Sequence, residues 1–382
     1  MATAVSSCTL ILAWLMLFRL GSLTGGLSAN EMSLLVHSNS WHNLIHNPFD
    51  LPLTALQWLT LTLASHPGHT IARVPSVVFG ILSLWAFTYI LRRWYGLRTA
   101  ALGTVLFVFS GWFLHASRLA SVDILYIFGL LSVIVLHILL ERAKNHWQAL
   151  IIFAATAVLL YIPGFIWLLA IMYFWQWRNV ARTWRLLPSW WGPLTLSLLV
   201  LAIVSLLGHA LWRTHALIRP WLGLPAHFAS IITILHHLVN VFSYLVVRGP
   251  HTPQIWLPGL PILDIFTIAM SGLGIYFYAR HWRAPRARLL VSLLAIGAVL
   301  IAVGGPLSES LIIPIIFILA AAGVAYLLHE WLQVFPFNPL ARGIGIGVLG
   351  VAIALVTLYN LREYYVAWPH NPETVATFKD RF

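Results

Sequence analysis

The chain has 382 residues, of which 60% are hydrophobic and only 8% are charged. Water-soluble domains carry roughly 25% charged residues, so this composition excludes a soluble fold. The net charge of +12 could suggest a nucleic-acid partner, but the basic residues sit in short segments between long apolar runs. That arrangement is typical of the cytoplasmic Lys/Arg excess of a multi-pass membrane protein, and we expect no nucleic-acid partner.

Apolar runs of about 20 residues recur along the whole chain, and this is the length that a helix needs to cross a bilayer. No run alternates as in a membrane barrel, so the spans are predicted to be helical. The predicted fold class is all-α, a polytopic transmembrane bundle of about eleven spans with a helical first extracytoplasmic loop. The predicted spans are Thr3–Leu20, Ile71–Leu91, Thr99–Leu114, Ile124–Leu140, Trp147–Ile162, Gly164–Trp177, Trp191–Trp212, Leu260–Tyr278, Leu289–Gly304, Leu311–Leu328 and Ile344–Leu358.

The distribution of Arg and Lys sets the predicted orientation. With the N-terminus in the cytoplasm, the cytoplasmic loops hold most of the basic residues and only Glu141 and Glu330 as acids. Two further apolar stretches, Leu51–Ser65 and Pro225–Val247, are placed at the membrane surface, because making either one a span would turn later arginines outward. Pro225–Val247 is interpreted either as a surface helix beside a lipid access route or as a strut over the bundle. We expect an integral plasma-membrane protein whose active site is extracytoplasmic.

One transmembrane domain is predicted over residues 1–361. It includes a first extracytoplasmic loop at 21–70 and a second extracytoplasmic region at 213–259, and residues 362–382 are predicted to form a short extracytoplasmic tail. The segment Trp147–Trp177 would be about 46 Å long as one helix, which exceeds a hydrocarbon core of roughly 30 Å. Pro163-Gly164 is therefore predicted to break it into a hairpin of two short helices.

Two carboxylates stand out among only 10 acidic residues. Glu31 lies just beyond the first span, and Asp123 opens the fourth. Ionisable groups at span ends are costly and often functional. Each also has a structural interpretation. Ser28 and Glu31 match a capping box, whereas Asp123 could favour a helix N-terminus by its charge or pair with Arg118.

Four short motifs occur in an order that resembles a known family. They are Leu27–Glu31, Ile71–Ser76, Leu91–Gly96 and Ser117–Asp123. Together they resemble the GT-C superfamily of polyprenyl-phosphate-sugar-dependent transferases, in the branches of the protein O-mannosyltransferase-like enzymes and the aminoarabinose transferase of lipid A. The similarity is clearest over residues 10–140.

The resemblance implies a fold of eleven or more spans and an essential acid in the first outer loop. Glu31 falls on the position of that acid, and Asp123 matches a second acid near the start of the fourth span. The Ser-Arg pair that precedes the second acid in the family matches Ser117 and Arg118. The chain departs from the family at Asn30-Glu31, where Asp or Asp-Glu is often found.

The resemblance further implies that the donor is a sugar on a polyprenyl phosphate, a membrane-lipid partner. An inverting single displacement would transfer the sugar to an unidentified acceptor, which could be protein, lipid or glycan. Glu31 and Asp123 are the predicted catalytic residues, because a carboxylate can take the proton of the acceptor hydroxyl. Fixed cations would stabilise the leaving phosphate. The predicted lipid-phosphate or donor-binding residues are Arg118, Arg73, Arg248 and His115, with Arg19 as a further candidate. Each arginine could instead be an interfacial anchor.

The chain has 17 histidines, and none shows the regular spacing of a zinc site. No cofactor is firmly expected, and interfacial histidine is the alternative interpretation. If a divalent ion binds, Glu31, Asp50 and His46 are the first candidate ligands.

Two other functions remain open at this stage. A lipid-linked sugar flippase or other transporter often shows paired repeats and midplane polar groups, and the sequence shows neither clearly. A polysaccharide ligase would depend on outer-loop residues such as Arg219 and His236 more than on acids.

Overall fold

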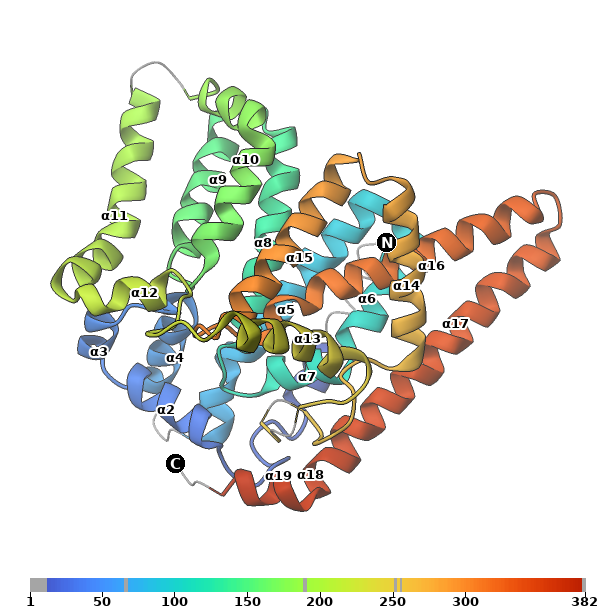
Figure 1. The fold of residues 1–382 in the computed structure, drawn as a ribbon, viewed down its shortest axis with the longest axis horizontal. Helices are drawn as coiled ribbons and strands as arrows, with labels where there is room; N and C mark the ends of the chain where they lie inside the picture. The colour runs from blue at the N-terminus through green and yellow to red at the C-terminus, as the bar shows by residue number, and fades with distance from the viewer. Residues whose placement is uncertain (1–11, 65–67, 188–190, 251–252, 255, 380–382) are drawn as a thin grey trace.

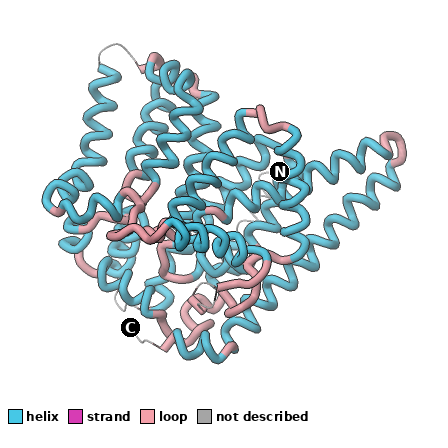
Figure 2. The backbone as a smooth tube through the Cα atoms, viewed as in Figure 1, coloured by secondary structure: helices cyan, strands magenta, loops and turns pink. Residues whose placement is uncertain are grey.

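The computed structural model describes residues 12–64, 68–187, 191–250, 253–254 and 256–379. Within these ranges the chain is an all-α bundle without a β-strand, as the composition predicts (Figures 1 and 2). The α-helices are α2 (Ala29–Ser38), α3 (Trp41–His46), α4 (Leu51–Leu63), α5 (His69–Tyr95), α6 (Leu97–Val108), α7 (Gly111–Arg118), α8 (Asp123–Arg142), α9 (His146–Leu159), α10 (Phe165–Trp184), α11 (Trp191–Arg213), α12 (Ile218–Trp221), α13 (Ile231–Val246), α14 (Ile265–Arg280), α15 (Pro285–Ala302), α16 (Ile313–Val334), α17 (Pro339–Arg362), α18 (Trp368–His370) and α19 (Pro372–Thr377). Two 3-10 turns, η1 (His215–Leu217) and η2 (Glu309–Leu311), and one π-turn, η3 (Glu363–Ala367), complete the described elements.

Six helical segments among the described residues are long and apolar enough to cross a membrane. They are α5, α8, α11, α15, the run from η2 through α16, and the run from α17 through α18. The number rises to seven if α6 and α7, which bend by 64° at their junction, form one broken span. The chain is therefore an integral multi-pass membrane protein. The number eleven remains a prediction, since α9 and α14 are shorter and half of Thr3–Leu20 lies outside the described residues.

The predicted span Thr99–Leu114 corresponds to two helices, α6 and α7, with a bend of 64° between them. Helix α6 ends at Val108, and the Ser110 side chain accepts a hydrogen bond from the Phe113 N–H to start α7 in a new direction. A serine at the N-cap satisfies one of the free N–H groups of a new helix, so the bend occurs where the sequence offers a cap. This bend sets α7 directly against the turn that leads to Asp123.

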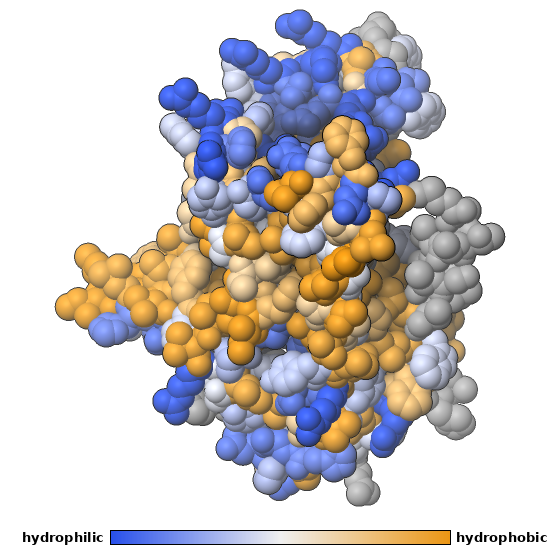
Figure 3. Space-filling model, turned by 90° about the vertical axis from the view of Figure 1, so that its right-hand side faces the viewer, coloured by the Kyte–Doolittle hydropathy of each residue, from blue (hydrophilic) through white to orange (hydrophobic). Residues whose placement is uncertain are grey.

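An apolar band crosses the middle of the molecule, with hydrophilic residues above and below it (Figure 3). Helices α11 and α17 lie at opposite edges of the bundle and leave most of their apolar side chains exposed (Figure 1). In water this exposure would be unfavourable, whereas lipid tails are as apolar as these side chains. The two helices are therefore lipid-facing.

Helices α5, α8 and α16 carry much of the buried core. Helix α14 packs against α16 at two glycines. A Cβ atom on Gly274 would lie 1.9 Å from the Leu319 carbonyl oxygen, and one on Gly323 would lie 1.9 Å from the Met270 carbonyl oxygen. Small residues of this kind allow two membrane helices to bring their backbones together.

We expect Gly323→Ala to destabilise the protein by about 1–3 kcal/mol, because the added methyl group would clash with the backbone of α14, which cannot move away as a flexible side chain could. The midpoint of thermal unfolding in detergent measures this effect. Gly347→Ala is the matched control, since a Cβ atom on Gly347 would meet nothing within 4 Å. Equal midpoints for the two variants would contradict this account of the α14–α16 contact.

The predicted break at Pro163-Gly164 is confirmed. Helix α9 ends at Leu159 and α10 begins at Phe165, so the pair forms a hairpin. Gly164 adopts φ +79°, a conformation that strongly favours glycine, and its N–H donates to the Trp221 carbonyl oxygen at 2.9 Å.

The C-terminal segment is docked on the bundle. Helix α17 continues without interruption through η3 and α18, so the predicted boundary at residue 361 falls within a continuous helical run. Trp368 is fully buried, stacks on Tyr364 with ring centroids 5.4 Å apart, and donates its indole N–H to the Pro253 carbonyl oxygen at 3.0 Å. These contacts hold Pro253 against the C-terminal segment.

Candidate active site

A cavity of about 540 Å³ lies where α2, the turn before α8, and η2 meet. Its walls hold Glu31 and Asp123, two residues far apart in the sequence, together with Glu309, which the sequence analysis did not single out. We call it the carboxylate cavity. Its other lining residues are Ser28, Asn30, Ser33, Leu34, His37, Trp112, Leu119, Ser121, Val122, Gln254, Leu307 and Ser308.

The capping box at the start of α2 is confirmed. The Glu31 N–H donates to Ser28 Oγ at 3.3 Å, and the Ser28 N–H donates to Glu31 Oε2 at 3.0 Å. Ser28 is extended, with φ −84° and ψ 162°, as an N-cap requires. The two bonds fix the first turn of α2 and therefore fix where the Glu31 carboxylate lies.

A buried arginine holds the same carboxylate. Arg73 Nε donates to Glu31 Oε1 at 2.8 Å, and Arg73 Nη2 donates to Glu31 Oε2 at 2.9 Å. The Ala120 N–H also donates to Oε1 at 2.9 Å. With the bond from Ser28, the two Glu31 oxygens accept four hydrogen bonds, which fills the capacity of a carboxylate. Both side chains are only 1% exposed.

The rest of the Arg73 guanidinium binds the loop that leads to α2. Nη1 donates to the Leu20 carbonyl oxygen at 2.9 Å, and Nη2 donates to the Gly26 carbonyl oxygen at 2.9 Å and to Thr24 Oγ1 at 3.3 Å. All of these acceptors belong to residues 20–31. Arg73 therefore joins α5 to the first loop, and it does not line the carboxylate cavity.

Asp123 faces the cavity from the opposite side. It is the first residue of α8, where the helix dipole favours a negative charge. Its Oδ2 accepts from Ser121 Oγ at 2.9 Å, and its Oδ1 accepts from Ser308 Oγ. Two hydroxyl donors occupy only half of the hydrogen-bonding capacity of the carboxylate. Asp123 is therefore oriented and still able to accept hydrogen bonds from a bound molecule.

Glu309 follows Ser308 on η2 and brings a third carboxylate to the cavity. The Ser308 hydroxyl that donates to Asp123 also accepts from the Ser310 N–H at 3.1 Å. Trp112 donates its indole N–H to Ser310 Oγ at 2.9 Å. These bonds tie η2 to α8 and α7, and they place Glu309 close enough to Asp123 for the two charges to repel each other.

Arg118 and His115 lie behind the cavity wall. Arg118 is 1% exposed, donates to the carbonyl oxygens of Leu15 and Phe18, and lies over the Tyr365 ring with its carbon Cζ 4.8 Å from the centroid. The suggested pairing of Arg118 with Asp123 was wrong. His115 is also buried, contacts the Gln254 carbonyl oxygen through Nε2, and packs on Trp368 with ring centroids 4.6 Å apart.

Arg248 lies elsewhere, exposed just beyond the end of α13. Of the six residues predicted for catalysis or donor binding, the structure thus brings two, Glu31 and Asp123, to one cavity. The four residues predicted to bind the lipid phosphate or the donor, Arg118, Arg73, Arg248 and His115, do not line it.

The arrangement of helices is similar to that of solved membrane enzymes. Two crystal structures of ArnT from Cupriavidus metallidurans, one in the apo state and one bound to undecaprenyl phosphate, each match with a TM-score of 0.56. Each match covers 99% of this chain and 77% of ArnT, at 14% and 15% sequence identity respectively. The chain has the GT-C fold.

An archaeal protein has a similar arrangement of helices. The oligosaccharyltransferase of Archaeoglobus fulgidus, in a complex with Zn and sulfate, matches with a TM-score of 0.54 and 16% identity. That match covers 94% of this chain and 53% of the archaeal protein. No protein family and no curated protein matches at the level of sequence. The similarity therefore extends over nearly the whole bundle while the sequences have diverged.

The three candidate metal ligands do not assemble. The described residues contain no group of three or more His, Cys, Asp or Glu side chains arranged to hold a metal ion. Glu31 is bound to Arg73, and His46 is exposed, with its Nε2 atom 3.0 Å from Nε2 of His42. Asp50 lies at the start of α4, where its N–H donates to the Tyr161 carbonyl oxygen at 3.0 Å.

Asp50 has an unusual backbone conformation and a raised side-chain pKa. It adopts φ +55°, which is uncommon for a residue with a side chain, and its buried Oδ1 atom has no hydrogen-bond partner among the described residues. Asp50 as a whole residue is half-buried, its Oδ1 atom is buried, and burial raises the pKa of Asp50 from 3.8 to about 7. The folded protein therefore favours the protonated carboxyl group.

We expect the folded protein to lose stability as the pH rises from about 4 to about 7. Over this range the unfolded chain releases the Asp50 proton while the folded chain retains it, so the contribution present at low pH is lost. The loss should be on the order of 4 kcal/mol for a shift of this size. Unfolding midpoints measured in detergent between pH 4 and pH 8 would reveal it.

Asp50→Asn is the matched variant for this test. Asparagine has the same shape, tolerates a positive φ and carries no titrating proton. The pH dependence of the midpoint should flatten in the variant, whereas a slope equal to that of the unmodified protein would contradict the assignment to Asp50.

Proposed function

We propose that the protein is a membrane glycosyltransferase that moves a sugar from a polyprenyl-phosphate carrier to an acceptor hydroxyl on a protein, lipid or glycan. The observation that carries this proposal is the meeting of Glu31 and Asp123 on one cavity within a GT-C fold. The ArnT structure bound to undecaprenyl phosphate supports a polyprenyl phosphate as the carrier.

The positions of the cavity and of Arg142 at opposite ends of α8 support an extracytoplasmic location for the cavity. Asp123 begins this helix of 20 residues and Arg142 ends it, so the cavity lies about 30 Å from Arg142. Arg92 and Arg93 likewise lie near the end of α5, while Arg73 lies near its start. Arginines collect on the cytoplasmic side of membrane proteins, and about 30 Å is one hydrocarbon thickness. The cavity would then open away from the cytoplasm, with the N-terminus inside.

Asp123 is the base in this proposal. The acceptor oxygen attacks the anomeric carbon, and the bond between that carbon and the phosphate oxygen breaks as the polyprenyl phosphate leaves with the electron pair. The Asp123 carboxylate takes the acceptor proton. A single displacement of this kind inverts the anomeric configuration.

Glu31 acts as a positioning residue in this proposal. Its two oxygens already accept bonds from Arg73, Ser28 and Ala120, so taking a proton would require one of these bonds to break. Asp123 lies only three residues after Ala120, so the Glu31 bond to Ala120 fixes the turn that carries the base. Arg73 and Arg118 likewise belong to the scaffold, which leaves Arg248 and Arg19 as the predicted arginines not yet given a structural role.

Purified protein in proteoliposomes, supplied with a radiolabelled polyprenyl-phosphate sugar and a membrane extract as the source of acceptors, tests the proposal. Transfer would appear as label in an acid-stable covalent product together with free polyprenyl phosphate. Movement of labelled carrier across the bilayer without a covalent product would instead support a flippase. Transfer that depends on Arg219 or His236 and is indifferent to Asp123 would support a polysaccharide ligase.

A further inference from the structure

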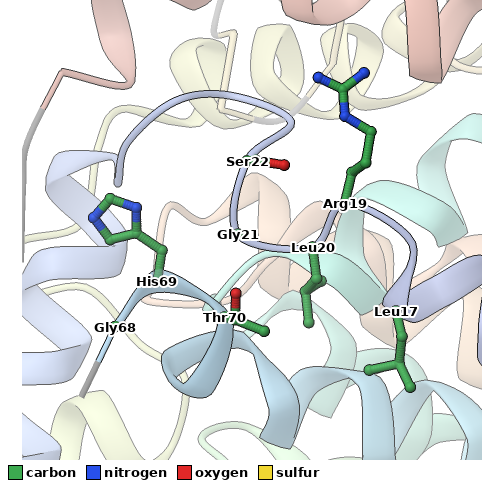
Figure 4. Close-up of a pocket in the computed structure, with 8 residues that line it drawn as sticks. All are labelled: Leu17, Arg19, Leu20, Gly21, Ser22, Gly68, His69 and Thr70. Atoms are coloured by element: carbon green, nitrogen blue, oxygen red, sulfur yellow. The ribbon is translucent and has the colours of Figure 1, made fainter. Parts of the chain in front are cut away.

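A second cavity, of about 570 Å³, lies between residues 17–22, which precede α2, and residues 68–70 at the start of α5. Figure 4 shows Arg19 and Ser22 on this loop, above the start of α5, which contributes His69 and Thr70. The sequence offered Arg19 only as a further phosphate candidate. The structure places Arg19 apart from the carboxylate cavity, in this separate cavity that we call the Arg19 cavity.

The backbone at Arg19 is left-handed, with φ +53°. Few residues other than glycine adopt this conformation, and such outliers are concentrated at functional positions. The N–H groups of Ser22 and Leu23 donate to the Arg19 carbonyl oxygen at 3.2 Å and 3.1 Å, which closes a tight turn. The turn projects the Arg19 side chain outward on the same side of the loop as the Ser22 hydroxyl (Figure 4).

The polar groups of this cavity are donors that suit an anion. Within the part of the chain that the structure describes, the side chains of Arg19, Ser22 and Thr70 form no hydrogen bond or ion pair with the protein. None of the described lining residues is acidic. A guanidinium group and two hydroxyl groups without a competing carboxylate are the donors that bind phosphate oxygens well.

The surface that leads to Arg19 is apolar. Trp14, Leu17 and Phe18 precede it and are 62%, 48% and 43% exposed, and the rings of Trp14 and Phe18 pack with centroids 5.3 Å apart. A ligand that meets Arg19 with its phosphate could lay a hydrocarbon chain along these side chains. Free phosphate would contact only the hydrogen-bond donors of the cavity, whereas a lipid phosphate would contact these donors and the apolar side chains as well.

We infer that the Arg19 cavity binds the phosphate group of a membrane lipid, with the hydrocarbon chain along Trp14, Leu17 and Phe18. The lipid phosphate could belong to a phospholipid headgroup or to a polyprenyl phosphate, which share this chemistry. The site would act separately from the proposed transfer reaction, so its test needs no knowledge of the acceptor.

One buried residue, Arg73, connects the walls of the Arg19 cavity and the carboxylate cavity. Leu20 lines the first and Glu31 lines the second, and Arg73 donates to both, to the Leu20 carbonyl oxygen at 2.9 Å and to Glu31 Oε1 at 2.8 Å. A lipid bound at Arg19 would therefore rest on the same loop that holds Glu31 in place.

Native mass spectrometry of the intact protein in a neutral detergent would count bound lipids and measure their affinities. The probes are dioctanoyl phosphatidylglycerol, farnesyl phosphate, inorganic phosphate and uncharged dioctanoylglycerol. We expect at least one of the two lipid phosphates to bind and Arg19→Gln to weaken that binding about tenfold, since charge-assisted bonds are lost. Arg283→Gln, which alters an exposed arginine at a distant turn, should change the affinity less than twofold.

A preference for the monoester would identify the polyprenyl phosphate, and a preference for the diester would identify a phospholipid. Both results support the proposal. Binding that is unchanged by Arg19→Gln, or that falls equally in Arg283→Gln, would overturn it, as would inorganic phosphate or dioctanoylglycerol binding as tightly as the lipid phosphates. If Arg19→Gln does not fold, the double variant Ser22→Ala/Thr70→Val should weaken lipid binding about threefold, and an unchanged affinity in that variant would equally overturn the proposal.

Discussion

Asp123→Asn is expected to reduce sugar transfer by about 10²- to 10⁴-fold while leaving the protein folded. Asparagine keeps the shape of the side chain and can still hydrogen-bond to the hydroxyls of Ser121 and Ser308, but it cannot take a proton from an acceptor hydroxyl. The rate of label transfer from a radiolabelled polyprenyl-phosphate sugar, at saturating donor, measures the change. Thermal unfolding of the same preparation would show that the fold is retained.

Glu373→Gln is the matched control for this experiment, because Glu373 is an exposed carboxylate on α19 and lines neither cavity. Its rate should equal that of the unmodified protein. Glu309→Gln distinguishes Asp123 from Glu309, the two carboxylates of the cavity that form no ion pair with the described residues. If Glu309→Gln abolishes transfer and Asp123→Asn does not, the base is Glu309 and the assignment of Asp123 is wrong.

Much of the architecture could be predicted from the sequence because it depends on local signals. Apolar length and the scarcity of charge determine the all-α membrane bundle. Ser28 and Glu31 are spaced as a capping box, and Pro163-Gly164 marks a helix break, so both features appear where the pattern places them. Glu31 and Asp123 were singled out by their positions at span ends and by the family resemblance, and one cavity brings them together.

The pairing of Glu31 with Arg73 could not be predicted, because it joins residues from different segments. The sequence identified both side chains by type and gave each a role toward a substrate. In the structure the two side chains form an ion pair, with Arg73 Nε 2.8 Å from Glu31 Oε1. Neither side chain could take the predicted role toward a substrate without breaking that ion pair. Glu309 was missed although it carries the same signal as Asp123, an acid beside serines at the start of a span.

The buried pair itself gives the second large prediction, and it distinguishes a positioning role of Glu31 from a catalytic one. Arg73→Met should destabilise the protein by about 3–5 kcal/mol, because the Glu31 charge would remain buried with only the N–H groups of Ser28 and Ala120 as partners. Glu31→Gln should cost a similar amount, since it leaves the Arg73 guanidinium without its counter-charge. The free energy of unfolding from denaturant titration in mixed micelles measures both effects.

The double variant Glu31→Gln/Arg73→Met should be destabilised by clearly less than the sum of the two single changes, because neither charge is then left buried alone. Strictly additive effects would mean that the two residues do not act as a pair.

The transfer rate and the free energy of unfolding, measured on the same variants, together decide the role of Glu31. If Glu31 positions the turn of Ala120 and Asp123, the transfer rate should fall in both single variants, and the fall should follow the loss in the free energy of unfolding. If Glu31 were instead the base, Glu31→Gln would lose transfer at conditions where its loop is still folded, and Arg73→Met would retain far more activity than Glu31→Gln.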